Sequence, residues 1–250
     1  MVATAAGRAR AGTSSFYVWY AGVCVLIAFG GFFPTYWAKI ATGTFTGAPV
    51  LHFHGMLFFS WTLLFFAQTW LAAQGRIRHH QSFGILGVAL ASAMGISVFL
   101  AALNTISAAA HLGMDDQARR FAVVSLGALV TCAVLFTLAI MNTHRPEIHK
   151  RLMVLFMVPL MQAAMARPFG AILAPGAVGP PPVEAAVAPG LLVCLLFVAA
   201  MIHDWRTIGR VHPVYLIGGP IIAAQIVLDV PLSQTDFWMQ IVHALETLKG

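Results

Sequence analysis

The chain has 250 residues, of which 60% are hydrophobic and only 9% are charged. Soluble domains carry about 25% charged residues, so this composition excludes a protein whose whole surface faces water. The net charge of +6 does not indicate a nucleic-acid partner, because the basic residues are spread along the chain rather than clustered in a water-facing domain.

Seven apolar stretches fill most of the chain, and each is long enough to cross a bilayer. A spanning helix needs roughly 20 apolar residues, and these runs are continuous rather than alternating as barrel strands are. We predict an all-α integral membrane protein, a seven-helix transmembrane bundle that forms one domain over residues 1–250. The predicted helices cover residues 16–40, 50–74, 83–110, 121–142, 152–173, 187–205 and 214–230.

The first apolar stretch resembles a signal peptide, because Arg8 and Arg10 precede it. Its length of about 25 residues is too great for a typical signal sequence, whose apolar part has about 7–15 residues. We therefore expect it to remain as the first spanning helix.

The distribution of basic residues predicts the orientation. With the first helix starting inside, nine Lys or Arg residues share one membrane side and five the other, and the richer side is normally cytoplasmic. This predicts a cytoplasmic N-terminus in a bacterial inner membrane, with the bilayer as the first partner. The nine residues are Arg8, Arg10, Arg76, Arg78, Arg145, Lys150, Arg151, Arg206 and Arg210.

A short amphipathic helix is predicted over residues 236–248, on the outer face. Phe237, Ile241, Leu245 and Leu248 recur at helical spacing and form one apolar stripe, with Trp238 and Val242 beside it. Such a stripe is typical of a helix that lies in the membrane interface.

Two histidines begin two of the predicted spans. His80 precedes the third span and His149 precedes the fifth, so both lie at the same depth on helices that run in the same direction. Haem iron takes one axial ligand on each side of the porphyrin, so this pair is a candidate for binding haem b. An ordinary basic loop that contains histidine is the alternative. Residues expected to neutralise the haem propionates are Arg76, Arg78, Lys150 and Arg151.

Other histidines are candidates for a bound copper, iron or zinc ion. His52 and His54 lie early in the second span, but residues two apart on a helix point roughly 200° apart, so both cannot face one ligand unless the helix start is irregular. His54 is the better candidate, since Gly55 follows it. The metal candidates are His52, His54, His80, His149 and His212, with His111 as a weak partner of His54.

Charged and sulfur-containing residues lie inside the spans. Arg167 falls in the outer half of the fifth span, where an unpaired charge is costly, so we expect it to pair with Asp229 or to hold an anion such as a propionate. Methionines recur every fourth residue from Met153 to Met165, and this pattern indicates adaptable packing. The three cysteines are read in the same way, as small packing residues.

Several tracts resemble known membrane proteins. The residues His54, Trp61, Gln68, Gly75-Arg76, His80 and Gly84, the tract from Arg145 to Met153 and the tract from Gly209 to Pro213 resemble poorly characterised bacterial multi-pass membrane proteins. The tract His149-Lys150-Arg151-Leu152-Met153 resembles small membrane proteins linked to terminal-oxidase maturation. The histidine placement is similar to that of transmembrane b-type cytochromes, but the fourth span has no histidine, which departs from a di-haem pattern.

Three functions follow as hypotheses. The first is a b-type haem protein that carries electrons within the membrane, with quinone or another redox protein as partner, and hence an oxidoreductase. The second is an enzyme or assembly factor with a histidine-bound copper, iron or zinc ion. The third is a structural subunit of a larger membrane complex.

Overall fold

The computed structural model describes residues 2–247, with side chains from residue 15 onward. Every regular element in this range is a helix, and seven helical segments are long and apolar enough to cross a membrane. The prediction of an all-α, seven-span membrane protein is therefore confirmed. Leu248 and the side chains of Arg8 and Arg10 lie outside the described part.

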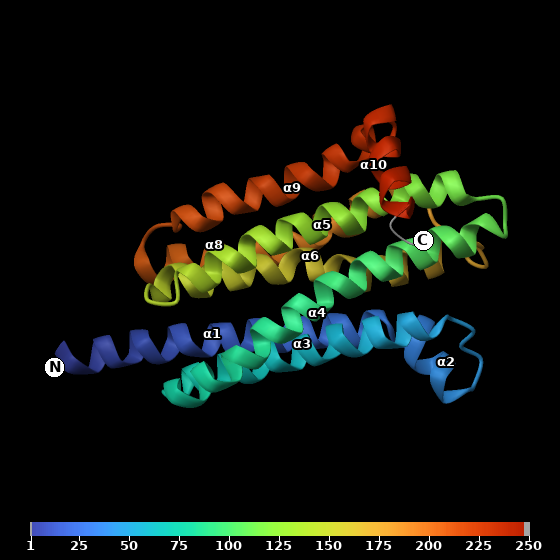
Figure 1. Ribbon diagram of the computed structural model, residues 1–250. Coiled ribbons are helices and arrows are strands. Elements are labelled where there is room, and N and C mark those ends of the chain that lie inside the picture. Colours follow the sequence, from blue (N-terminus) through green and yellow to red (C-terminus); the bar gives the residue numbers. More distant parts are fainter. Residues whose placement is uncertain (1, 248–250) are drawn as a thin grey trace.

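The long helices run side by side, and a short C-terminal helix crosses them at one end (Figure 1). We call this the α10 end, and the opposite end, where α4 and α6 begin, the His80 end. The elements are α1 Val2–Gly31, the π-helical turn η1 Phe33–Trp37, α2 Ala38–Ala41, α3 Pro49–Ala73, α4 Ile77–Ala110, α5 Asp115–Met141, α6 Pro146–Leu173, the 3-10 turn η2 Val183–Ala186, α7 Val187–Val193, α8 Leu195–Ile208, α9 Pro213–Ser233 and α10 Asp236–Thr247.

Several helices begin before the apolar runs that predict them. The structure starts α4 at Ile77 rather than residue 83, α5 at Asp115 rather than 121, and α6 at Pro146 rather than 152. Apolar composition marks the hydrocarbon layer, whereas the helical backbone continues into the polar interface, where Pro146 suits a first turn and Asp115 suits the positive end of the helix dipole. His80 and His149 consequently lie in first helical turns and not in loops.

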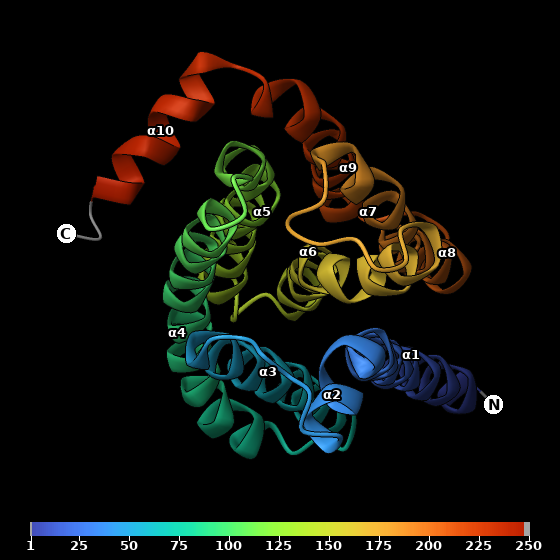
Figure 2. The same cartoon turned by 90° about the vertical axis from the view of Figure 1, so that its right-hand side faces the viewer.

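Helix α6 occupies the middle of the bundle, with α1, α3, α4, α5, α9 and the α7–α8 pair around it (Figure 2). Its apolar window is the most deeply buried of the seven spans. Tyr20 of α1 donates a hydrogen bond to the carbonyl of Val154 at 3.0 Å, and the Trp61 indole of α3 reaches the Met157 sulfur at 3.3 Å. Met157 is fully buried and Met161 nearly so, as expected for packing residues.

Two spans are irregular where the backbone ladder is interrupted. Pro34 has no N–H to donate, and at this point α1 passes into η1, where the amide of Trp37 donates to the carbonyl of Phe32, five residues earlier, at 3.3 Å. The sixth span is divided at Cys194, between α7 and α8. All three cysteines are free and buried, which agrees with their expected role as packing residues.

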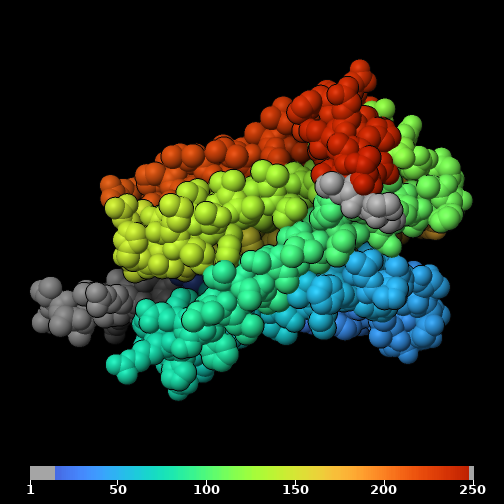
Figure 3. Space-filling model, viewed as in Figure 1, coloured from blue at the N-terminus to red at the C-terminus, as the bar shows by residue number. Residues whose placement is uncertain are grey.

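Helix α10 lies across α5, as the space-filling view shows (Figure 3). Its buried residues are Trp238 and Val242, whereas Phe237 is 65% exposed. Of the predicted stripe, Ile241 packs against the same apolar cluster as Trp238 and Val242, whereas Phe237 does not, so the stripe overlaps the buried face of α10 only in part. The Trp238 indole donates to the carbonyl of Arg119 at 2.9 Å, and this bond, which the helical spacing cannot show, fixes the rotation of α10.

Gly31 tests the close approach of α1 to α6. A Cβ at this position would lie 2.2 Å from the carbonyl oxygen of Ala164, whereas a Cβ at Gly30 would meet nothing within 4 Å. We expect Gly31→Ala to lower the stability by about 1–3 kcal/mol, because the two backbones must separate. Gly30→Ala is the matched control and should be neutral or slightly stabilising. Thermal unfolding in detergent measures both; equal midpoints for the two variants would contradict the packing.

Candidate functional site

The most deeply buried charges form an ion pair at the His80 end. Arg151 of α6 and Asp204 of α8 are 2% and 1% exposed, and two parallel bonds join them: Nε to Oδ2 at 2.8 Å and Nη2 to Oδ1 at 2.6 Å. The third nitrogen, Nη1, donates to the carbonyl and to a carboxylate oxygen of Glu147, at 2.7 and 2.6 Å. A buried guanidinium needs this full set of partners.

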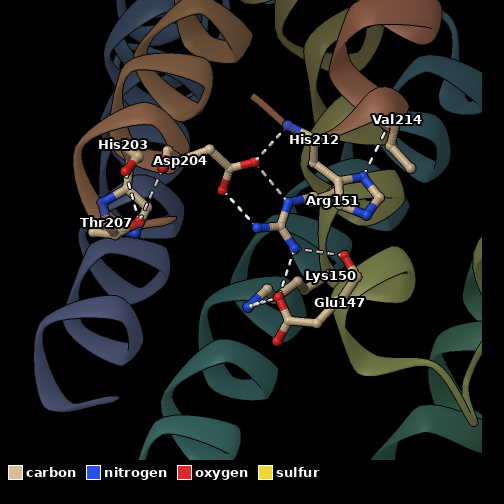
Figure 4. A network of polar contacts seen from close by, with 8 residues as sticks. All are labelled: Glu147, Lys150, Arg151, His203, Asp204, Thr207, His212 and Val214. Carbon is tan, nitrogen blue, oxygen red and sulfur yellow. Dashed lines mark hydrogen bonds and ion pairs between the residues drawn. The ribbon is translucent and has the colours of Figure 1, made fainter. Parts of the chain in front are cut away.

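Neighbouring residues extend this pair into a network (Figure 4). The Lys150 ammonium lies 2.8 Å from the Glu147 carboxylate. The amide of His212 donates to Asp204 at 3.3 Å, and His212 Nδ1 accepts the amide of Val214 at 3.2 Å. His212 thus caps α9 and connects the α8–α9 turn to α6. Burial lowers the pKa of His212, and the positive charge of Arg151 lowers it further.

His80 and His149 face each other across the bundle at the same end. Their ring centroids are 6.3 Å apart and the ring planes are almost perpendicular, at 88°. Both side chains are half-buried. The two histidines belong to helices with different neighbours: α4 packs chiefly on α3 and α5, whereas α6 packs on α1, α5 and α7. The structure therefore brings together the two histidines that the sequence singled out.

Each imidazole of this pair is held through its Nδ1 atom by the main chain. His80 Nδ1 lies 3.2 Å from the carbonyl of Gln68, whose side-chain amide in turn donates to the carbonyl of His80 at 3.0 Å. His149 Nδ1 lies 2.8 Å from the carbonyl of Ala139. A carbonyl accepts only, so Nδ1 must carry the proton and Nε2 keeps its lone pair. Metal-binding histidines are oriented in this way.

The histidines of the second span point apart, as the helical spacing predicts. His52 Nδ1 is 2.9 Å from the hydroxyl of Tyr36 in η1, whereas His54 Nδ1 is 3.1 Å from the hydroxyl of Ser97 in α4. The two imidazoles therefore do not share a ligand. Among the described residues, no group of three or more His, Cys, Asp or Glu side chains is placed to hold a metal ion.

The predicted pairing of Arg167 with Asp229 is wrong. The guanidinium of Arg167 lies over the ring of Phe32, 5.1 Å from its centroid, on the side of α6 that faces α1. Asp229 is 5% exposed and lies beside Gly127 of α5. Equal depth in the membrane does not set the rotation of a helix, so the sequence could not distinguish the two faces of α6.

The basic residues proposed for an anionic cofactor differ in their availability. Arg76 is exposed at the start of α4 and lies 5.5 Å from the Trp70 ring centroid. Arg151 is fully engaged by Asp204 and Glu147. Arg167 lies near the α10 end, far along α6 from His149.

Residues that sequence reasoning did not single out also meet at the His80 end. The ring of Phe16 stacks on His203, with centroids 3.9 Å apart and planes 4° from parallel, and Tyr215 is completely buried. His203 is half-buried inside α8. Its position next to Asp204, together with the apolar run before it, was the signal in the sequence.

Comparison with protein-family models, with curated proteins and with solved structures finds no match to this chain. Its function is therefore argued from the arrangement of its residues.

The Arg151–Asp204 pair gives a prediction for stability. Asp204→Asn leaves a buried guanidinium without its counter-charge, and we expect a loss of about 3 kcal/mol. Glu147→Gln is the matched control, because Glu147 also binds Arg151 but its side chain is 66% exposed; here the loss should stay below about 1 kcal/mol. Thermal unfolding in detergent compares the two, and a similar loss in both variants would contradict the analysis.

His212 gives a prediction for pH dependence. Its pKa is lowered in the folded protein, so the unfolded chain takes up the proton first and stability decreases as pH falls below about 6.5. His212→Asn keeps an acceptor for the cap of α9 but does not titrate there. We expect the midpoint of unfolding to decrease more in the wild type than in this variant between about pH 8 and about pH 5. The exposed His144→Asn should behave as the wild type; equal decreases in all three would refute the assignment.

Proposed function

We propose that this chain is a b-type haem protein of a bacterial cytoplasmic membrane, with His80 and His149 as the axial ligands. The observation that carries the proposal is the pair of facing imidazoles, each fixed at Nδ1 by a main-chain carbonyl. Bound haem would supply one-electron redox chemistry. The protein would then carry electrons within the bilayer, to or from quinone or another redox partner.

The spacing of the two rings supports this ligand pair. A metal–imidazole bond is about 2 Å long, and the ring centroid lies roughly 1 Å beyond the nitrogen, so two axial imidazoles on one iron have centroids about 6 Å apart. The observed separation is 6.3 Å. The separation of the two rings is therefore compatible with one iron bound by both imidazoles.

The number of ligands favours haem over a bare metal ion. A haem of the bis-histidine type uses two protein ligands, whereas zinc sites use three or four. At the His80 end two imidazoles meet, and no third His, Cys, Asp or Glu of the described chain joins them as a metal-binding group. The alternative of a copper, iron or zinc site would require further ligands to move in.

The surroundings of the pair suit a cofactor at the membrane boundary. One helical turn further into the bilayer lie Phe65, Phe136 and Met153, which belong to the apolar core or pack against it. They would exclude water from the membrane side of the iron. Toward the aqueous side the exposed Arg76 and Arg78 can meet propionate groups. Arg151 is committed to Asp204, and we no longer assign it this role.

The distribution of charge supports the orientation. The His80 end contains most of the basic residues of the chain, and by the positive-inside rule we infer that this end faces the cytoplasm. The proposed haem site would then lie near the cytoplasmic surface, and α10 would lie on the outer face.

Absorption spectroscopy of the purified protein tests the proposal. We expect a Soret band, and α and β bands after reduction with dithionite. His80→Ala and His149→Ala should each abolish the low-spin spectrum and most bound haem, because each removes one axial ligand. His79→Ala is the matched control, since this neighbouring imidazole is exposed, and it should keep the wild-type spectrum.

The negative results of this experiment are also informative. Folded protein with no haem absorption would refute the proposal. Copper, iron or zinc in the same sample, lost in His80→Ala, would then support the metal-binding alternative. A protein with neither cofactor that co-purifies with other membrane subunits would support a structural role.

A further inference from the structure

A second polar site lies at the opposite end of the bundle, around Asp229 of α9. This carboxyl is 5% exposed and sits one helical turn before the end of the span. None of the ion pairs formed by the described side chains includes it. A buried carboxyl within a membrane span is costly to keep and is by default a candidate functional group.

The groups in contact with Asp229 are neutral. Gln225 lies one turn earlier on the same face of α9, and its side-chain oxygen accepts a hydrogen bond from the hydroxyl of Thr131 in α5. Gly127 of α5 leaves the space that Asp229 needs, because a Cβ there would lie 3.3 Å from Asp229 Oδ1 and 2.9 Å from Gln225 Nε2. Helices α5 and α9 thus surround the Asp229 carboxyl group with neutral groups.

The charged groups on the elements that pack against α9 pair with residues other than Asp229 or point away from it. Helix α7 has no titratable residue, and on α6 Arg167 points to Phe32 on the other side. On α5, Arg120 donates to the carbonyl of Ser233 and to Gln234, both at 3.0 Å, beyond the end of the span. Also on α5, Arg119 pairs with Asp115, Asp116 and Glu246, and Glu246 in turn lies beside His243 of α10. Glu184 of η2 and Asp236 of α10 are exposed. The other charged or titratable groups of α6 and α8 lie at the His80 end: Glu147, His149, Lys150, Arg151, His203, Asp204 and Arg206.

A surface pocket lies at the α10 end, beyond Asp229 along α9. This pocket of about 270 Å³ is lined by Gln117, Arg120, Pro182, Val183, Glu184 and Gln234, and it has room for several water molecules, each of which occupies about 30 Å³. Arg120 joins this pocket to Ser233, which is fully buried one turn beyond Asp229 on the same face of α9. The pocket and Ser233 therefore lie on the α10-end side of the carboxyl group, one helical turn from it.

We propose that Asp229 is a proton-binding site, which exchanges its proton with water at the α10 end through the pocket beside Arg120. In an apolar environment without a cation, the neutral acid is the stable form of a carboxyl group. Gln225 and Thr131, one turn away, carry no charge and hydrogen-bond to each other, so they supply no positive charge that would stabilise the ionised form. This site does not depend on the proposed haem ligands, which lie at the other end of the bundle.

Labelling of the full-length protein in detergent with dicyclohexylcarbodiimide tests the proposal. This apolar reagent adds as a whole molecule to a protonated carboxyl group within the membrane, and peptide mass spectrometry locates the product. We expect Asp229 to be labelled, at a rate that falls about tenfold for each pH unit once the acid ionises. Asp229→Asn should lose the label and Asp229→Glu should regain it.

Matched controls separate this site from general carboxyl reactivity. Asp236, seven residues further on and exposed, should react with a water-soluble carbodiimide and not with the apolar one, and Asp236→Asn should leave the labelling of Asp229 unchanged. Labelling of Asp229 that is no faster than that of Asp236, or that does not change with pH, would overturn the proposal. Protection by sodium ions at constant pH would overturn it as well, since the site would then bind metal cations.

Discussion

The hydrogen bonds of one buried guanidinium, that of Arg151, determine much of this structure. Arg151 can lie inside the bundle because Asp204 and Glu147 accept hydrogen bonds from all three of its nitrogen atoms. These bonds fix the rotation of α6, the central helix. His149 precedes Arg151 by two residues and so points about 200° away from it, toward Ala139 and His80. The same interaction that pairs α6 with α8 thus directs an imidazole into the other half of the protein.

Helices α5 and α6 divide the bundle into two halves with different contents. On one side α1, α3 and α4 complete a ring whose interior is filled by aromatic side chains, with Trp61, Phe136 and Phe156 in mutual contact. On the other side α7, α8 and α9 enclose polar side chains, among them Gln162, Asp204 and Asp229. An apolar barrier of Leu155, Phe197 and Ile222 separates the buried groups at the two ends of this second half.

The two proposed sites lie at opposite ends of the bundle: the His80–His149 pair at the His80 end and Asp229 near the α10 end. The proposed haem ligands are held by main-chain carbonyls, which accept a hydrogen bond from Nδ1 of each ring and leave Nε2 as the atom that could bind iron. Asp229 instead has neutral amide and hydroxyl groups around it, and such surroundings tolerate the uptake of a proton. Each site thus has surroundings suited to the transfer proposed for it.

The sequence by itself determined the helical class, the seven spans and the divergence of His52 from His54, because apolar run length and the 3.6-residue period are local properties. It also placed His80 and His149 at the starts of two parallel helices. Only the tertiary structure decided which face each helix turns inward. In the folded protein Arg167 contacts Phe32 and not Asp229. Trp238 rather than Phe237 packs on α5, and Arg151 pairs with Asp204. Helix rotation depends on partners from distant segments, and a pattern along the chain does not contain that information.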